Sequence, residues 1–350
     1  MAQVAVIGGG AFGTAMACVL RRRGHVVRLW ARESEVVAAI NVQRANPTFL
    51  PGVGLPDGIV ASTDVAATVH AAEFVLLAPP AQHMRAVTLQ LQPVLAAGTP
   101  VISCSKGIEH GSCALMSQVI AQTLPNSRIA VLSGPSFAAE IAADLPTGVT
   151  LACADPVLGT HLEQAIGSAR FRVYLSDDLI GAHLGGVMKN VLAIACGIAT
   201  GKSLGANARA TLITRGLAET VNLGLALGAR LETFLGLCGI GDIDLSCNSP
   251  QSRNMSLGLA LGQGRRLADV LRERLTVQEG VHSTEAVVQL AARLNVEMPI
   301  AGAVDAVLNH DAPIDATIAA LLALPVGVEI PVVPIHYRGA PPAIASTIHA

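Results

Sequence analysis

Short apolar runs alternate with segments of helical periodicity through the first half of the chain. The runs predict β-strands at residues 3–7, 25–30, 74–78, 99–103, 128–132 and 148–152. A predicted helix at residues 12–23 separates the first two strands. Because these strands have apolar residues on both flanks, we expect a parallel sheet with helices covering both faces. The alternation predicts an α/β fold with a doubly wound parallel sheet.

The pattern changes after Tyr174. Residues 176–178 (Ser-Asp-Asp) are typical of a helix cap, and long segments rich in Ala and Leu follow them without convincing strands. We therefore expect a doubly wound domain at residues 1–178 and an all-helical second domain at residues 179–323. Residues 324–350 contain five prolines and few charges, which predicts an extended C-terminal tail.

Composition excludes one broad class of function. The chain has 350 residues, of which 51% are hydrophobic and only 14% charged, so it can bury a core and disorder is not expected. Aromatic residues make up 3% and the formal net charge is −2, which argues against nucleic-acid binding. The only basic cluster, at residues 21–23, is interpreted as a helix C-terminus meeting its own dipole.

Several features favour a cytoplasmic protein without a membrane span or a metal. The longest uncharged stretch, residues 86–105, contains two prolines and a glycine, and other apolar runs are too short or carry Pro or a charge. The N-terminus lacks the pattern of a signal peptide. Seven scattered cysteines without a CxxC motif are typical of reduced thiols, and no Cys/His cluster suggests a metal site.

A glycine-rich loop follows the first predicted strand. Gly8, Gly10 and Gly13 fit the pattern G-x-G-x-x-G, directly after an apolar strand and at the start of a helix rich in small residues. In this context the pattern predicts a Rossmann dinucleotide site. Gly8 would permit the tight turn, Gly10 the approach of the pyrophosphate, and Gly13 close packing of helix and strand. Ala11 and Phe12 would offer backbone N–H groups at the helix N-terminus.

The residues after the second strand bear on which dinucleotide binds. An NAD site usually places an acidic residue here for the ribose hydroxyls. This chain has Arg32, which could pair with a 2′-phosphate, followed by Glu33, which argues the other way. The alternative for both is a solvated loop. We expect NADP or NAD, with NADP preferred.

One lysine stands alone on a long apolar helix. Residues 179–201 are predicted to be helical and carry a single fixed charge, Lys189. An ammonium in such surroundings is costly unless it snorkels or meets partners. Gly185 and Gly186 lie one turn before it, although each glycine costs a helix ~1 kcal/mol relative to alanine. They would let a substrate or a second backbone approach; the alternative is a snorkelling lysine beside a helix-packing glycine pair.

Four polar segments interrupt the apolar pattern. They are residues 105–109 (SKGIE), 133–138 (SGPSFA), 239–242 (GIGD) and 252–254 (SRN). The first two follow predicted strands at the edge where doubly wound sheets bind ligands. Individually each segment could be turn chemistry. Together Lys106, Lys189, Arg253 and the small polar groups predict an anionic, phosphorylated carbonyl substrate.

With the glycine loop, these segments resemble NAD(P)-dependent glycerol-3-phosphate dehydrogenase of the bacterial soluble type. The shared motifs are the loop at 8–13, SKGIE, GPSFA with Glu140, KN at 189–190, GIGD, SRN and EMPI at 297–300. They run in the family's order from about residue 3 to residue 323. The resemblance implies a Rossmann domain followed by a helical domain, and a homodimer. The implied reaction reduces dihydroxyacetone phosphate to sn-glycerol 3-phosphate for phospholipid synthesis.

The resemblance also implies residue roles. Lys189 would be the general acid/base that protonates the ketone oxygen as hydride arrives, and neighbouring cations and desolvation would lower its pKa. Asp242 would line the substrate site and orient Lys189. The other implied substrate contacts are Lys106, Gly134, Ser136, Ser252, Arg253 and Asn254. The implied cofactor contacts are Lys106, Ala138, Arg253, Val277 and Glu279.

Two departures from the family pattern and two alternatives remain. The family's loop is often Gly-Ser-Trp-Gly, so Ala11 lacks a hydroxyl and we expect altered cofactor affinity; the tail also lacks the expected charged ending. Another lysine-using two-domain enzyme, such as a 3-hydroxyacid dehydrogenase or ketopantoate reductase, would share the loop and a helical lysine but not GPSFA with SRN. A catalytically silent dinucleotide sensor need not keep Lys106, Lys189 and Arg253.

Overall fold

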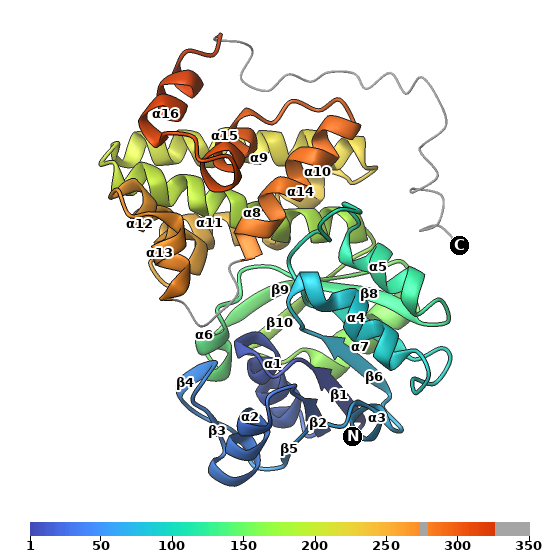
Figure 1. The fold of residues 1–350 in the computed structure, drawn as a ribbon. Coiled ribbons are helices and arrows are strands. Elements are labelled where there is room, and N and C mark those ends of the chain that lie inside the picture. Colours follow the sequence, from blue (N-terminus) through green and yellow to red (C-terminus); the bar gives the residue numbers. More distant parts are fainter. Residues whose placement is uncertain (274–278, 326–350) are drawn as a thin grey trace. The chain divides into compact units, whose positions relative to one another are not determined.

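The computed structural model describes residues 1–273 and 279–325, and it divides the chain into two units (Figure 1). The first unit consists of Met1–Gly107 and Ala114–His183, and the second of Ile108–Cys113 and the chain from Leu184 onward. A short segment therefore leaves the first unit, packs within the second and returns.

An eight-stranded sheet forms the centre of the first unit (Figure 1). Its strands, in spatial order, are β10 (Phe171–Ser176), β9 (Thr147–Cys153), β8 (Arg128–Ser133), β7 (Pro100–Ser103), β6 (Phe74–Leu77), β1 (Gln3–Ile7), β2 (Val26–Trp30) and β5 (Ile59–Ser62). Neighbouring strands are parallel except β8 and β9, which pair antiparallel. The doubly wound α/β fold is confirmed, with a mostly parallel sheet in place of the fully parallel one expected.

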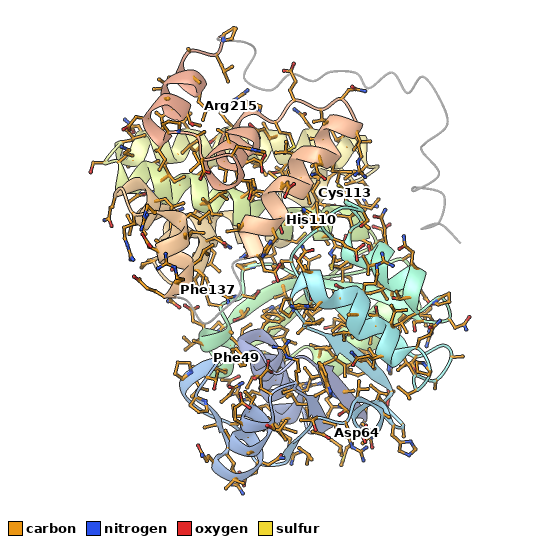
Figure 2. All side chains as sticks on the ribbon, in the orientation of Figure 1. Phe49, Asp64, His110, Cys113, Phe137 and Arg215 are labelled. Atoms are coloured by element: carbon orange, nitrogen blue, oxygen red, sulfur yellow. The ribbon has the colours of Figure 1, made fainter. Side chains whose placement is uncertain are left out.

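Both faces of this sheet are buried under helices, as the apolar strand flanks predict. In β1, Val4 and Val6 belong to one hydrophobic cluster, and Ala5 and Ile7 belong to the other. The first cluster includes side chains of α1 (Ala11–Arg22), α2 (Ser34–Ala38), α6 (Ala138–Ala142) and α7 (Pro156–Ile166). The second includes side chains of α3 (Val65–Val69), α4 (Met84–Leu91) and α5 (Met116–Thr123). Asp64 caps α3 by accepting the N–H of Ala67 (Figure 2).

The six predicted strands are confirmed within about two residues at each end. Two strands of the eight-stranded sheet were missed by the pattern, β5 and β10, and both lie at its edges. Edge strands are covered less completely: Val60, Tyr174 and Leu175 are exposed, so apolar side chains mark these strands less clearly. A hairpin of β3 (Ala45–Asn46) and β4 (Leu50–Gly54) was also missed.

Two arginines at the end of α1 form hydrogen bonds to the C-terminal ends of other helices. Arg22 donates to the carbonyls of Ile141 and Ala142 in the last turn of α6, and Arg23 donates to that of Gln164 in the last turn of α7. The predicted position of the run at a helix C-terminus is confirmed, because Arg21 and Arg22 lie in the last turn of α1 and Arg23 is its C-cap. The side chains of Arg22 and Arg23 satisfy acceptors that every helix C-terminus leaves without an intrahelical partner.

Among its described residues, the second unit contains helices and no strand element (Figure 1). The helices are α8 (Leu179–Gly201), whose first residues belong to the first unit, α9 (Gly205–Ala226), α10 (Leu231–Phe234), α11 (Asp242–Asn248), α12 (Arg253–Gly262), α13 (Leu267–Arg272), α14 (Glu279–Arg293), α15 (Pro299–Asn309) and α16 (Ile314–Leu322). By length and composition α8 could cross a bilayer, but 83% of its most apolar window is buried inside the protein. Such burial is what the core helix of a globular protein shows.

A buried carboxyl group joins two helices of the second unit. Glu219 of α9 accepts the N–H groups of Ile300, at 2.7 Å, and Ala301, at 3.1 Å, in the first turn of α15. Burial raises the pKa of Glu219 to about 7, although both hydrogen bonds lower it. The side chain acts as a cap supplied by a residue some 80 positions earlier.

Candidate active site

The glycine loop between β1 and α1 has the shape that the dinucleotide fingerprint requires. Gly8 has a φ of +122°, and a Cβ there would lie 2.7 Å from the carbonyl oxygen of Ala78. A Cβ on Gly13 would collide with the carbonyl oxygen of Gly8. These two glycines are therefore required by the backbone turn and by the close packing of helix and strand.

Gly10 is different, because neither conformation nor packing requires a glycine there. Its backbone is extended, with φ −68° and ψ 179°, and a Cβ would meet nothing within 4 Å. The missing side chain leaves open space at the N-cap of α1, where no side chain satisfies the first N–H groups. An anion at this position would meet free N–H groups and the positive end of the helix dipole. The loop thus fits the pyrophosphate of a dinucleotide, with Ala11 and Phe12 opening the helix.

The two residues considered for cofactor selectivity bind each other. Arg32 donates from Nε (3.1 Å) and Nη2 (2.8 Å) to Oε1 of Glu33. The Arg32 side chain is 76% exposed and that of Glu33 is 28% exposed. An exposed ion pair of this kind is worth ~0–1 kcal/mol, so a ligand phosphate can compete for the guanidinium.

Lys106 lies beside the GPSFA segment in the first unit. Its Nζ donates to the carbonyl of Gly134 at 2.8 Å and lies 3.4 Å from Oγ of Ser136. Burial raises the pKa of the neighbouring thiol, Cys104, to about 12, although Lys106 lowers it, so this cysteine stays protonated at neutral pH. Ala138 begins α6 three residues after Pro135. The structure therefore brings Lys106, Gly134 and Ser136 together, as the sequence led us to expect.

In the second unit, Lys189 of α8 lies next to Asp242, the first residue of α11. Their Nζ and Oδ1 atoms are 3.9 Å apart, and the side chains are 16% and 1% exposed. A carboxylate at this distance favours the ammonium form. A lysine held in the ammonium form by this carboxylate could donate a proton to a substrate.

The glycine before Lys189 lets a second backbone approach. A Cβ on Gly185 would collide with the carbonyl oxygen of Cys238 and lie 3.2 Å from Cα of Gly239. Cys238 and Gly239 belong to η3 (Leu237–Gly241), a short π-helical turn that leads directly into Asp242. The close contact of α8 and η3 therefore sets where Asp242 lies relative to Lys189.

The SRN segment forms the start of α12. Ser252 is the N-cap and accepts the N–H of Met255 at 3.3 Å. Asn254 is buried and donates to Oδ1 of Asn190, the residue after Lys189, at 2.8 Å. Its own Oδ1 is buried and has no hydrogen-bond partner among the described residues. A buried acceptor of this kind would suit a substrate hydroxyl.

Burial lowers the pKa of the Arg253 guanidinium, whereas the charge of Glu279, the first residue of α14, raises it. The structure thus brings Lys189, Asp242 and the SRN segment into one unit, with Asn190 linking the KN and SRN motifs. Asn190 was not among the predicted site residues, although its place after Lys189 was a usable signal. Val277, a predicted cofactor contact, lies outside the described residues.

The SKGIE segment is divided between the two units. Ser105, Lys106 and Gly107 belong to the first, whereas residues 108–113 belong to the second and lie along α14 (Figure 2). His110 pairs with Glu285 at 3.0 Å, and Arg293 donates to the carbonyls of Gly111 and Ser112. Within the described ranges, no three His, Cys, Asp or Glu side chains are grouped to hold a metal ion.

Comparison with known proteins gives consistent matches over most of the chain. The family model "NAD-dependent glycerol-3-phosphate dehydrogenase N-terminus" matches residues 3–158, and the corresponding C-terminus model matches residues 178–319. The chain is 53% identical to glycerol-3-phosphate dehydrogenase [NAD(P)+] of Parvibaculum lavamentivorans over 92% of its length and 97% of the relative's. It is 54% identical to the Rhodospirillum rubrum protein of the same name, over 93% and 94%.

Solved structures agree with this picture. The glycerol-3-phosphate dehydrogenase of Coxiella burnetii superposes with a TM-score of 0.89 at 38% identity, over 92% of this chain and 99% of that one. A ketopantoate reductase of Ralstonia eutropha has a TM-score of 0.57 at 18% identity, over 90% and 99%. That second likeness shows a shared fold only.

Proposed function

The chain belongs to the NAD-dependent glycerol-3-phosphate dehydrogenase family, and from this premise we propose that Lys189 is the general acid/base of its reaction. The enzyme reduces dihydroxyacetone phosphate to sn-glycerol 3-phosphate with NAD(P)H, and its product feeds phospholipid synthesis. The observation that carries the proposal is the Lys189–Asp242 pair, an ammonium held by a carboxylate that is 1% exposed.

When bound, NADH or NADPH would supply the hydride for the carbonyl carbon of the substrate. As the C=O π electrons move onto oxygen, Lys189 Nζ gives that oxygen one proton, and a secondary alcohol results. Asp242 holds the ammonium in place and stabilises it until the transfer. In the oxidative direction the neutral amine takes the proton back.

We assign binding roles to the basic and amide groups of each unit separately. Arg253 binds the phosphate, assisted by Ser252 and Asn254, because a guanidinium presents several donors that match phosphate oxygens. In the first unit, Lys106 contacts both substrate and cofactor, and Gly134 and Ser136 contact the substrate. The hydrogen bond from Lys106 to the Gly134 carbonyl supports this role.

Replacing Arg253 by alanine should raise KM for dihydroxyacetone phosphate about 10- to 100-fold, because a hydrogen bond to a charged group contributes ~1.5–3 kcal/mol. Initial rates followed at 340 nm measure the change. Unphosphorylated dihydroxyacetone is the matched control, and its kcat/KM should change little because it has no phosphate for Arg253 to bind. An equal loss with both substrates would remove Arg253 from the phosphate site.

We further propose that the loop glycines, Ala138, Val277 and Glu279 contact the cofactor and that the enzyme prefers NADP through Arg32. The exposed pairing of Arg32 with Glu33 supports a site at which a 2′-phosphate competes with a carboxylate. By function, residues 1–178 would bind the dinucleotide and residues 179–323 the substrate. A homodimer located in the cytoplasm completes the proposal.

The arginine–glutamate pair gives opposite predictions for two variants. Arg32→Ala should lower kcat/KM for NADPH about tenfold and leave NADH nearly unchanged. Glu33→Gln removes the competing charge and should raise the NADPH-to-NADH ratio about two- to fivefold, because an exposed pair is worth ~0–1 kcal/mol. Parallel assays at 340 nm with each cofactor measure both ratios. Equal effects of Arg32→Ala on the two cofactors would assign that side chain to a solvated loop.

A further inference from the structure

Asn46, on the short strand β3, reaches the glycine loop from a distant part of the sequence. Its side-chain Nδ2 donates to the carbonyl oxygen of Gly9 at 2.8 Å and to Oγ1 of Thr14 at 2.8 Å. Its Oδ1 accepts the N–H of Phe49, at 3.2 Å, in the turn between β3 and β4 (Figure 2). The residue has no exposed surface. Both N–H donors and one acceptor site of the amide are thus satisfied inside the protein.

The hydrogen bond from Asn46 to the Gly9 carbonyl fixes the orientation of the whole Gly9–Gly10 peptide. No cis peptide bond occurs among residues 1–273 and 279–325, and in a planar trans peptide the C=O and the following N–H point in opposite directions. Holding the Gly9 carbonyl toward Asn46 therefore turns the Gly10 N–H away from it. Gly10 is the loop residue that neither backbone conformation nor packing requires to be a glycine.

Thr14 makes the arrangement rigid. Its Oγ1 accepts from Asn46 and lies 3.4 Å from the Gly9 carbonyl oxygen, while its own N–H bonds the Gly10 carbonyl at 3.0 Å. Thr14 is also fully buried. Rotating the Gly9–Gly10 peptide would leave buried polar groups without partners, which costs ~1–3 kcal/mol for each.

We propose that Asn46 is a positioning residue for dinucleotide binding, which holds the Gly9–Gly10 peptide so that the Gly10 N–H is presented to the pyrophosphate. A donor oriented in advance contributes to affinity because binding does not have to order it. The pyrophosphate is common to NAD and NADP, so Asn46 acts equally on both cofactors, unlike Arg32. This inference rests on the proposed cofactor role of the glycine loop.

The test is Asn46→Leu, which keeps the approximate shape of the side chain and removes its hydrogen bonds without adding charge. We expect the dissociation constants of NADPH and NADH, measured by titration calorimetry, to rise together about 10- to 100-fold. With saturating cofactor, kcat and KM for dihydroxyacetone phosphate should stay within about threefold of the parent enzyme. A purely structural role would lower the melting temperature without this selective loss of cofactor affinity.

Asn41→Leu is the matched control. Asn41 also uses both ends of its amide, bonding the carbonyl and N–H of Ala61 in β5, but it does not touch the glycine loop. It should lower the melting temperature and leave both dissociation constants within about twofold. If the two variants lose cofactor affinity equally, the proposal is overturned.

Two further variants test the proposal if Asn46→Leu does not fold and separate it from the cofactor role of the loop. Should Asn46→Leu fail to fold, Thr14→Val removes one partner of Asn46 at nearly constant volume and should weaken both cofactors about three- to tenfold; unchanged affinity would overturn the proposal. Gly10→Val tests the loop itself, since its extended backbone accepts a side chain that would occupy the open space. If Gly10→Val binds cofactor normally, the glycine loop is not the cofactor site. If Gly10→Val weakens binding but the Asn46 and Thr14 variants do not, the loop assignment stands and the positioning role of Asn46 is refuted.

Discussion

Replacing Lys189 by methionine is expected to lower kcat for dihydroxyacetone phosphate reduction by ~10²–10⁴, the usual contribution of a general acid. Methionine keeps an unbranched apolar stem on α8 but cannot donate a proton. Cofactor affinity should stay within a few-fold of the parent enzyme. Single-turnover and steady-state rates at 340 nm measure the loss. Because Asp242 is 1% exposed and loses its ion pair with Lys189, thermal melting must confirm that the variant is folded.

Lys202→Met is the control for the lysine prediction. Lys202 lies just beyond the end of α8 and pairs at 2.5 Å with the exposed Asp315 of α16, away from Asp242. Its loss should change kcat by less than twofold. Lys189→Arg should remain nearly inactive, since a guanidinium keeps the charge but holds its proton too tightly to donate it. Near-normal turnover in Lys189→Met would contradict the assigned role.

Gly185→Ala is expected to lower both stability and turnover. The added Cβ would collide with the Cys238 carbonyl oxygen, so α8 and η3 must separate. Overpacking of this kind costs ~1–3 kcal/mol in the free energy of unfolding. It would also move Asp242 relative to Lys189, and a misplacement of about 1 Å can cost ~100-fold in rate. Urea denaturation and kcat at saturating substrates measure the two effects.

Gly302→Ala separates this contact from the general effect of adding a methyl group to a helix. Gly302 lies inside α15, and a Cβ there would meet nothing within 4 Å. Alanine should stabilise that helix by ~0.5–1 kcal/mol and leave kcat unchanged. If Gly185→Ala behaved in the same way, the contact between α8 and η3 would not control the Lys189–Asp242 pair.

Local hydrophobic periodicity correctly predicted several strands and helices. Six strands of the sheet, the helix after the glycine loop and the 23 residues of α8 follow from local hydrophobic periodicity. The roles of Gly8 and Gly13 follow from fixed spacing within one turn. Edge strands such as β10 were not predicted because helices cover them only in part. The pair of β8 and β9 is antiparallel, although a parallel sheet was expected. Strand direction depends on the connection that the chain takes, which periodicity does not reveal.

The residue types of the site were predictable from the sequence, but most of the contacts between distant residues were not. The sequence by itself determined that Lys189 is a lone charge on an apolar helix and that Lys106 follows a strand. The family resemblance implied that Asp242 orients Lys189, whereas only the tertiary structure joined Asn254 to Asn190 and brought Asn46 to the Gly9 carbonyl. Periodicity records which face of an element is buried. Which polar group meets which depends on how separate elements pack, and side-chain hydrogen bonds between distant residues leave no periodic trace in the sequence.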